Sequence, residues 1–434
     1  MGVLLCSRTM SADESQENEG AKAPTRARVA ASSRPVVRAR GVKVAQRAAW
    51  SIRAGHPWVF RDSIARDTGG LAAGATVSVA EDETGGVLGW GLVEPEGAVA
   101  VRMCGGAGTE QRWDAEVIEA RVRAAVEARA TIPETAVDAH RVIHGEGDGL
   151  PGVAVDRLGD FLLIYKYSRA AEPWMDWLVQ ALKNVLSPKG IYMQDRLKSV
   201  TPEDRRPPAF HLGGAVAPPE ITVTEDGLSF IVDPTAPTSP GLFLDLREGR
   251  RWAERLAPGK RVLNLFSFTG SFAVRAVRAK AAEVVNVDSA ARSHARCRQN
   301  LAASGLDPEA CEAVVADAFG YLERMRRRER DFDLVIVDPP PFSRVGGTMF
   351  SALRHWEDLM AAVAGVVAPG GHVLAISNAS RLADDELMGS LGMGAASAGR
   401  SARLSGECGL PEDFPTPAAF HEGRYLKVKL LRLA

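Results

Sequence analysis

The chain has 434 residues, of which 46% are hydrophobic, enough to bury the cores of two or three globular domains. Its formal net charge is −1, which excludes a globally basic surface, so any binding of nucleic acid must depend on local patches. There is no run of 18 or more apolar residues, and the five scattered cysteines form neither a Cys-x-x-Cys motif nor a His/Cys cluster; we therefore expect no membrane span, no disulfide framework and no metal site, as is typical of a globular protein in the reducing cytoplasm.

The first half of the chain is predicted to hold a tail and two domains. Residues 1–41 are polar and lack hydrophobic periodicity, which predicts a disordered tail. Residues 42–115 contain β-rich pieces such as "PWVFRDSI", "ATVSVAED" and "AVAVRM" between glycine-rich turns, the pattern of a small barrel. Residues 116–230 combine β-rich runs, such as "RVIHGEGDGLPGVAVDRL", with the helical segment "AEPWMDWLVQALKNVL". This region is predicted to be an α+β domain.

Residues 231–434 change character, because short apolar strands now alternate with helical segments. The predicted strands are "RVLNLFSF", "EVVNVDS", "EAVVADA", "DLVIVDPP" and "GHVLAIS". Alternation of this kind predicts an α/β fold with a parallel, doubly wound sheet. In such folds the ligand binds at the carboxyl ends of the strands, where the strand order reverses.

The residues that end the first three of these strands favour a nucleoside cofactor. Gly270 allows a tight turn into a helix, Asp288 ends the second strand where a carboxylate can bind a ribose, and Asp317 ends the third, where it suits a purine amine. The G-x-G-x-x-G turn that binds a pyrophosphate is absent, which argues against NAD. S-adenosylmethionine (SAM) is therefore the expected cofactor.

The fourth strand ends abruptly in "DPPPF", residues 338–342. Its consecutive prolines hold the loop extended and remove backbone donors. Asp338, the free carbonyl groups and the ring of Phe342 are suited to hold a flat group that carries N–H donors.

These motifs, together with "GLFLDLREGR", "CRQNLAASGL" and the closing "HEGRYLKV", resemble those of bacterial large-subunit (23S) ribosomal RNA methyltransferases of the cytosine-5 group. The resemblance implies a PUA-like RNA-binding barrel at residues 42–115, a middle domain at 116–230 and a Rossmann-like SAM-dependent methyltransferase domain at 231–434. It also implies specific contacts to the cofactor and the target.

By this resemblance, Phe266 and Gly270 border the cofactor, Asp288 holds its ribose, and Asp317 with Ala318 contacts its adenine. The segment from Asp338 to Phe342 then faces the target base. The implied partner is ribosomal RNA.

One position departs from the family pattern. The cytosine-5 enzymes carry a cysteine at the end of the fifth strand, where this chain has Asn378 in "AISNAS". Carbon 5 of a pyrimidine is a poor nucleophile until a thiolate adds to the ring. We therefore hypothesise that the target is an amino nitrogen, that Asp338 orients it, and that Asn378 shapes the base pocket.

Other interpretations stay open on sequence alone. The same motifs fit a catalytically inactive descendant, an unrecognised form of carbon methylation, and a non-catalytic RNA-binding or ribosome-assembly protein. An NAD-dependent oxidoreductase shares the fold and is a further alternative, although the absence of the glycine-rich turn argues against it. Asp245 and Arg247 of "GLFLDLREGR" are predicted either to lie at the rim of the cofactor pocket or to form a structural ion pair.

Overall fold

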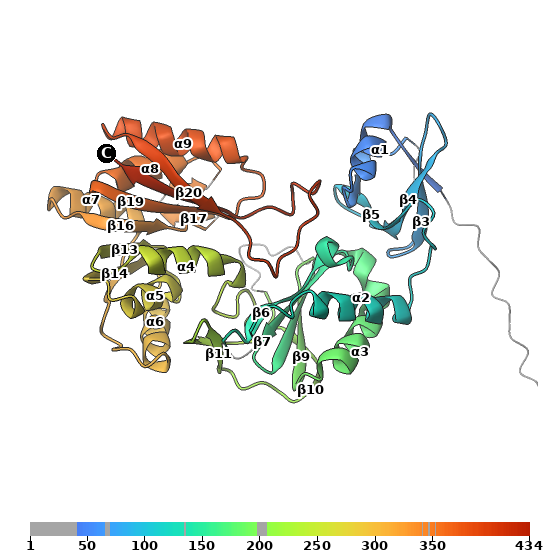
Figure 1. Cartoon of the computed structure of the whole chain (residues 1–434), viewed down its shortest axis with the longest axis horizontal. Helices are drawn as coiled ribbons and strands as arrows, with labels where there is room; N and C mark the ends of the chain where they lie inside the picture. Colours follow the sequence, from blue (N-terminus) through green and yellow to red (C-terminus); the bar gives the residue numbers. More distant parts are fainter. Residues whose placement is uncertain are drawn as a thin grey trace, which may run out of the picture. The chain divides into compact units, whose positions relative to one another are not determined.

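The computed structural model describes residues 41–65, 70–133, 136–197, 206–340, 342–345, 348–351 and 353–434, without the side chains of 342–350 (Figure 1). Ala39–Ala434 forms a compact unit. The predicted tail, apart from residue 41, lies outside the described residues. The three boundaries between the tail and the predicted domains stay predictions.

The N-terminal part forms a sheet in the order β1-β3-β4-β5-β2. These strands are β1 (Gly41–Val44), β2 (Trp58–Phe60), β3 (Thr76–Glu81), β4 (Val87–Val93) and β5 (Val99–Gly106), with helix α1 (Gln46–Arg53) after β1. Buried and half-buried residues alternate along β3, as expected for a strand with one face on a core. Val42, Val59, Val77 and Val101 belong to that core.

The middle part forms a sheet in the order β10-β9-β8-β7-β6. These strands are β6 (Ala139–His144), β7 (Val153–Leu158), β8 (Phe161–Lys166), β9 (Gly190–Asp195) and β10 (Phe210–Gly214). β8 and β9 are parallel, because the chain crosses over through helix α3 (Met175–Leu186). Helix α2 (Ala115–Glu127) packs against α3, and both helices contribute to a core that also contains Val155 and Ile164.

The C-terminal part is built on a sheet in the order β15-β14-β13-β16-β19-β21-β20. These strands are β13 (Arg261–Leu265), β14 (Glu283–Asp288), β15 (Glu312–Val315), β16 (Phe332–Val337), β19 (Val367–Ser377), β20 (Ala402–Cys408) and β21 (Lys427–Leu433). The predicted strands correspond to β13 to β16 and β19, and all are parallel as predicted. The antiparallel edge of β21 and β20 was not predicted.

Helices cover both faces of this sheet, as the doubly wound prediction requires (Figure 1). One face packs against α4 (Arg247–Leu256), α5 (Ser271–Arg278) and α6 (Ala291–Ala303), and the other against α7 (Ala318–Arg327), α8 (Trp356–Ala364) and α9 (Asp384–Ser397). A strand that is buried on both faces needs apolar side chains at successive positions, which explains the run Leu334 to Val337 in β16.

The described part of the chain also contains two hairpins outside these three sheets, together with four short 3-10 helices. The hairpins are β11 (Ile221–Glu225) with β12 (Leu228–Val232), and β17 (Phe342–Val345) with β18 (Thr348–Ser351). Within that part, no helix has both the length and the apolar composition to cross a membrane. The described side chains also include no group of three or more His, Cys, Asp or Glu residues arranged to hold a metal ion.

Candidate functional site

The strand order reverses between β13 and β16, because β14 and β15 extend the sheet on one side and β19 on the other. The carboxyl ends of β13 and β16 therefore flank the position where ligands bind in this class of sheet. The loop after β13 has an unusual backbone there. Phe266 and Phe268 have φ angles of 56° and 46°, values that bulky residues rarely adopt and that cluster at ligand sites.

Gly270 ends this loop and begins α5 with a φ of 75°. A Cβ atom at this position would lie 2.2 Å from Cys297 Sγ and 3.1 Å from Asn286 Nδ2, so a side chain has no room. The structure thus explains Gly270 by backbone conformation and by its packing against α6. Its predicted contact with the cofactor stays a prediction.

Asp288 connects the ends of neighbouring strands. Its Oδ2 accepts the backbone N–H of Phe268 at 2.9 Å, and its Oδ1 accepts that of Ala290 at 2.9 Å. Each oxygen keeps a further lone pair, so the carboxylate can hold the loop after β13 and still accept hydroxyl donors from a ribose.

Ser267 was missed by the sequence prediction. Its hydroxyl is buried and has no hydrogen-bond partner among the described residues, while its N–H donates to Val287 O at 3.1 Å. A buried hydroxyl without a partner is costly unless a bound molecule satisfies it. This orphaned group, next to Asp288 and the strained loop, fits a polar nucleoside cofactor such as SAM.

Asp317 has a structural role that its position alone did not reveal. It is the N-cap of α7, and its carboxylate accepts the N–H groups of Phe319 at 3.0 Å and Gly320 at 3.1 Å. Ala318 follows as a buried residue of α7. The predicted contacts of both residues with adenine remain predictions.

Asp338 directly follows β16 and is half-buried. Burial raises the pKa of its carboxyl group to about 7, and the negative charge of Asp245 adds to this effect while Arg250 opposes it. A carboxyl group with this pKa can accept or donate a proton near neutrality. The side chain of Phe342 lies outside the described part, so its predicted role is not tested.

A cleft of about 580 Å3 is linked to these groups through two of its lining residues: Asp245, whose charge acts on Asp338, and Phe243, whose ring contacts Phe268. Of the predicted site residues with described side chains, Asn378 lines this cleft, whereas Asp338 and the predicted cofactor residues do not. We call it the central cleft; its lining includes Trp58, Arg102, Arg141, Glu146, Asp156, Tyr165, Tyr167, Arg196, Phe243, Asp245, Asn378, Glu422 and Tyr425. Asn378 is exposed at the end of β19, so the structure places the residue that replaces the family cysteine in this cleft. Phe243 connects the cleft to the loop after β13, because its ring lies 5.3 Å from that of Phe268.

The two interpretations of Asp245 and Arg247 can now be separated. Asp245 lines the central cleft and accepts the hydroxyl of Tyr425 at 2.8 Å. Arg247 instead forms a buried ion pair with Asp413. The alternative that Asp245 and Arg247 pair with each other was therefore wrong.

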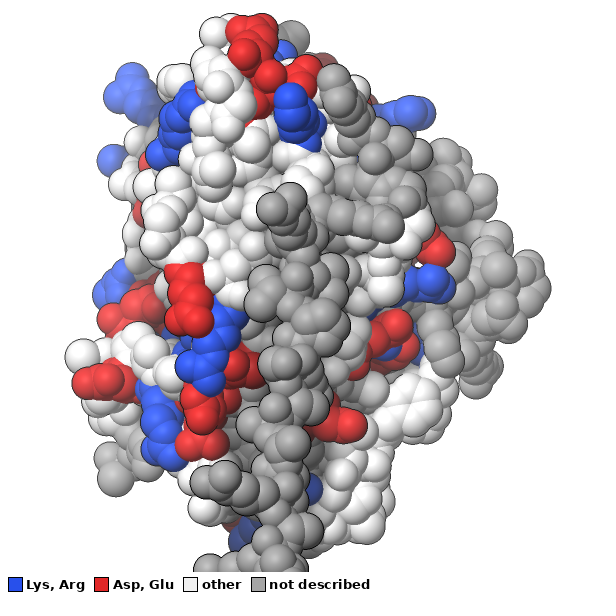
Figure 2. Space-filling model, turned by 90° about the vertical axis from the view of Figure 1, so that its right-hand side faces the viewer, with Lys and Arg blue, Asp and Glu red and all other residues white. Residues whose placement is uncertain are grey.

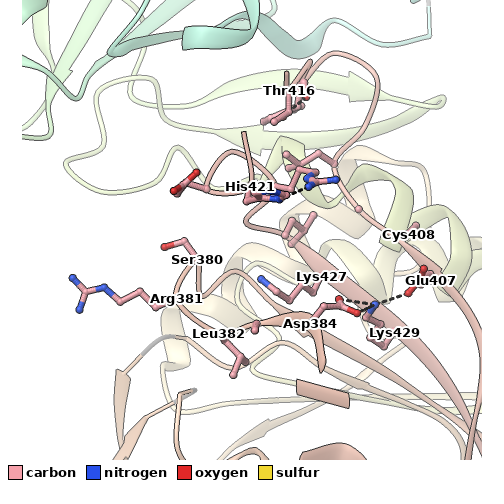
Figure 3. Close-up of a pocket in the computed structure, with 17 residues that line it drawn as sticks. Ser380, Arg381, Leu382, Asp384, Glu407, Cys408, Thr416, His421, Lys427 and Lys429 are labelled. Carbon is pink, nitrogen blue, oxygen red and sulfur yellow. Dashed lines mark hydrogen bonds and ion pairs between the residues drawn. The ribbon is translucent and has the colours of Figure 1, made fainter. Parts of the chain in front are cut away.

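Figure 3 shows another hollow, of about 980 Å3. It adjoins the central cleft, because Ser380, Thr416 and Glu422 line both. Lys427 points into this hollow; its Nζ donates to Ala379 O at 3.4 Å and to Tyr425 O at 3.3 Å, and burial lowers its pKa. Cys408 lines the same hollow rather than the central cleft. Burial raises the pKa of the Cys408 thiol to about 11, so it is not a substitute for the missing nucleophile.

Comparisons with known proteins identify the family. A family model described as "S-adenosylmethionine-dependent methyltransferase" matches residues 141–422, and a model of a PUA-like domain matches residues 42–104. The chain belongs to the SAM-dependent methyltransferases. This confirms the fold, the cofactor and the enzyme class expected from the motifs, and it replaces the NAD-dependent alternative.

Curated relatives of this methyltransferase extend over nearly its whole length. A protein of Shewanella denitrificans named "Ribosomal RNA large subunit methyltransferase I" is 32% identical over 88% of this chain and 96% of its own. A protein of the same name from Klebsiella pneumoniae is 31% identical over 86% and 93%. The names of these relatives agree with the resemblance to large-subunit ribosomal RNA methyltransferases that the motifs indicated.

Solved structures show the same fold. A methyltransferase complexed with SAH covers 91% of this chain and 100% of its own, with 24% identity and a TM-score of 0.82. A SAM-dependent methyltransferase from Streptococcus mutans has the same identity and coverage and a TM-score of 0.80.

Proposed function

We propose that this methyltransferase modifies a base of large-subunit ribosomal RNA. The names of its relatives and the PUA-like match support the substrate class. The observation that carries the proposal is the position of the central cleft. It joins the loop after β13 through the Phe243–Phe268 contact, and it contains Asn378 at the end of β19.

We infer that the target atom is an amino nitrogen of a base. SAM supplies an activated methyl group when bound. A carbon target would require a thiolate that adds to the ring, but Asn378 stands at that position and the half-buried Cys408 thiol lies in the neighbouring hollow. An amino nitrogen needs only hydrogen-bond acceptors that orient its lone pair, which carboxylate and amide oxygens provide.

Each residue then has a separate role. Asp338, when ionised, accepts an N–H of the amino group and receives the proton that the nitrogen loses. Asn378 offers an amide oxygen and an amide N–H to the edge of the base. Phe342 would stack on the base after it leaves its RNA context, a step that costs a few kcal/mol.

The cofactor residues follow the same reasoning. Asp288 would accept the ribose hydroxyls, Ser267 would bind a polar group of the cofactor, and Phe266 and Gly270 would border it. Asp317 and Ala318 would contact the adenine. We expect no metal ion in the reaction, and we expect the protein to act in the cytoplasm, where ribosomal RNA is assembled.

The test is methylation of an unmodified transcript of the source organism's large-subunit RNA by the purified protein and SAM. Mass spectrometry of the digested nucleosides should show a methylated amino base, which Asp338→Asn should reduce strongly. Appearance of 5-methylcytidine would overturn the inference about the target atom. Absence of any methylated nucleoside, on naked RNA and on ribosomal particles alike, would overturn the proposed function.

A further inference from the structure

Two tyrosines lie together where β8 ends: Tyr165 belongs to the strand, and Tyr167 directly follows its last residue. Tyr165 and Tyr167 are two residues apart, so their side chains project from the same face. Their ring centroids lie 6.3 Å apart with an angle of 22° between the planes, which is a stacked arrangement. Tyr165 is 5% exposed, whereas Tyr167 is 49% exposed, and both line the central cleft.

The inner ring of this stack is held in place. The guanidinium groups of Arg196 and Arg141 lie 5.2 Å and 5.8 Å from the centroid of Tyr165, as in cation–π contacts. Arg141 is itself bound to Asp156. The backbone N–H of Tyr167 donates to Gly152 O at 2.8 Å. These contacts hold the inner ring and the backbone of Tyr167, and the outer ring presents a partly exposed aromatic surface.

The charges of the cleft decide what this surface binds. Arg102 is paired with Glu94 and Glu146, and Arg141 with Asp156. Two further carboxylates, Asp245 and Glu422, line the cleft, as does a third guanidinium group, that of Arg196, which donates to Thr238 O. The four carboxylates of the lining, which include Glu146 and Asp156, thus outnumber its three guanidinium groups. A phosphate would meet these negative charges, whereas an uncharged planar group would not. The face of the molecule in Figure 2 likewise mixes Lys and Arg with Asp and Glu, rather than presenting a basic area.

We propose that Tyr167 is the stacking platform for an unpaired RNA base that flanks the methylated one. This proposal rests on the proposed function. We assign Tyr167 to a flanking base because it belongs to the middle sheet, where its ring stacks on Tyr165. The side of the cleft that contacts the catalytic sheet is formed instead by Phe243, whose ring contacts Phe268 in the loop after β13. Because Asn378 lines the same cleft, a single strand can place one base at Asn378 and its neighbour on Tyr167.

The experiment measures binding of the full-length protein to an in vitro transcript of the source organism's large-subunit RNA, without SAM. Tyr167→Ala should weaken binding about 5- to 100-fold, the effect of losing one base–aromatic stack, and Tyr167→Phe should bind like the wild type. The dependence of binding on salt should not change, because no phosphate contact is removed. In methyl-transfer assays the KM for RNA should rise while kcat is retained.

Trp177→Ala is the matched control, since Trp177 is an exposed aromatic residue of α3 that does not line the cleft. It should bind within twofold of the wild type. Calorimetry with SAM should give the same affinity for every variant, which shows that each one folds.

Several results would overturn the platform: no binding of the transcript by the wild type, a change below twofold for Tyr167→Ala, or an equal loss for Tyr167→Phe. If the wild type binds with the expected pattern but transfers no methyl group, the platform stands and the proposed function fails.

Discussion

Asp338 and Asp333 occupy opposite ends of β16 and have opposite electrostatic environments. Burial and the charge of Asp245 raise the pKa of Asp338 to about 7. Burial acts on Asp333 too, but the hydrogen bonds from the backbone N–H and guanidinium of Arg261 outweigh it and lower its pKa. The carboxyl group of Asp338 is therefore suited to proton transfer, whereas that of Asp333 has a structural role.

The pKa of Asp338 predicts how activity depends on pH. If the ionised carboxylate accepts the amino N–H, kcat/KM for RNA should rise as the pH increases through about 7 and level off above it. Asp338→Asn should lower kcat/KM about 100-fold or more and remove this rise. A pH profile of the wild type that is flat between pH 6 and 8 would contradict the assignment.

The same pKa predicts how stability depends on pH. An unfolded Asp has a pKa of about 3.9, so the folded protein binds the Asp338 proton more tightly between about pH 4 and 7. Through this group the free energy of unfolding falls as the pH rises across that window. Asp338→Asn should therefore raise the free energy of unfolding at pH 8, by on the order of 2–4 kcal/mol, and change it little at pH 4.

Asp333→Asn is the control with the opposite sign. The folded state lowers the pKa of Asp333, so the ionised Asp333 stabilises the folded protein above the pKa of an unfolded Asp. This contribution to the free energy of unfolding is lost as the pH falls. This substitution should destabilise the protein at pH 8. Urea unfolding of both variants at several pH values checks the pair, and equal signs at pH 8 would contradict it.

Gly270 allows a prediction that separates backbone strain from crowding. Gly270→Ala combines a positive φ with a Cβ that meets Cys297 Sγ at 2.2 Å, so it should cost about 2–4 kcal/mol in the free energy of unfolding. Gly259→Ala has a similar φ of 69° but nothing within 4 Å, and should cost only about 1 kcal/mol. Adding Cys297→Ala should restore part of the loss in the first variant and none in the second.

At the scale of elements, α7 and α2 begin in the same way. Asp317 caps α7, and Asp114 caps α2 by accepting the N–H of Val117 at 3.1 Å. Either residue changed to alanine should cost about 1 kcal/mol, because a helix N-terminus loses its cap. Only Asp317→Ala should also weaken SAM binding, since α7 begins at the carboxyl end of β15. Calorimetry with SAM decides this; an unchanged affinity would leave Asp317 with a capping role alone.

At the scale of the whole molecule, the segment between β20 and β21 connects distant parts of the chain (Figure 1). Asp413 is fully buried, pairs with Arg247, and accepts the backbone N–H of Arg141 at 2.8 Å. Arg129 donates to the carbonyl of Asp413 at 2.8 Å. Residues later in this segment, such as Thr416 and Glu422, line both the central cleft and the neighbouring hollow.

This arrangement predicts a large effect from one substitution. Asp413→Ala leaves the buried Arg247 without a partner and should lower the free energy of unfolding by about 3–5 kcal/mol. Glu309→Ala removes a single Arg–Glu contact, to Arg298 at 3.0 Å, in which both side chains are exposed. It should cost less than about 1 kcal/mol. Comparable losses in chemical denaturation would contradict the role of Asp413.

The parallel strands and the acids that end them could be predicted because each depends on local signals. An apolar run such as that of β16 can be recognised without knowledge of the strands that pair with it. The carboxyl ends of the strands in a doubly wound sheet lie at one edge, whatever the lengths of the connecting loops. The antiparallel edge was missed because β20 is largely exposed and polar. Ser267 was missed because its hydroxyl is distinguished only by being buried without a hydrogen-bond partner among the described residues, which the sequence does not show.

By itself, then, the amino-acid sequence determined the family, the parallel sheet, the SAM chemistry and the absence of a cysteine at position 378, since these depend on short motifs in order. The tertiary structure alone decided that Tyr167, Asp245 and Tyr425 line the same cleft as Asn378, and that Arg247 pairs with Asp413. These residues are separated by tens to hundreds of positions. Contacts of that kind arise from packing between elements, which no local pattern encodes.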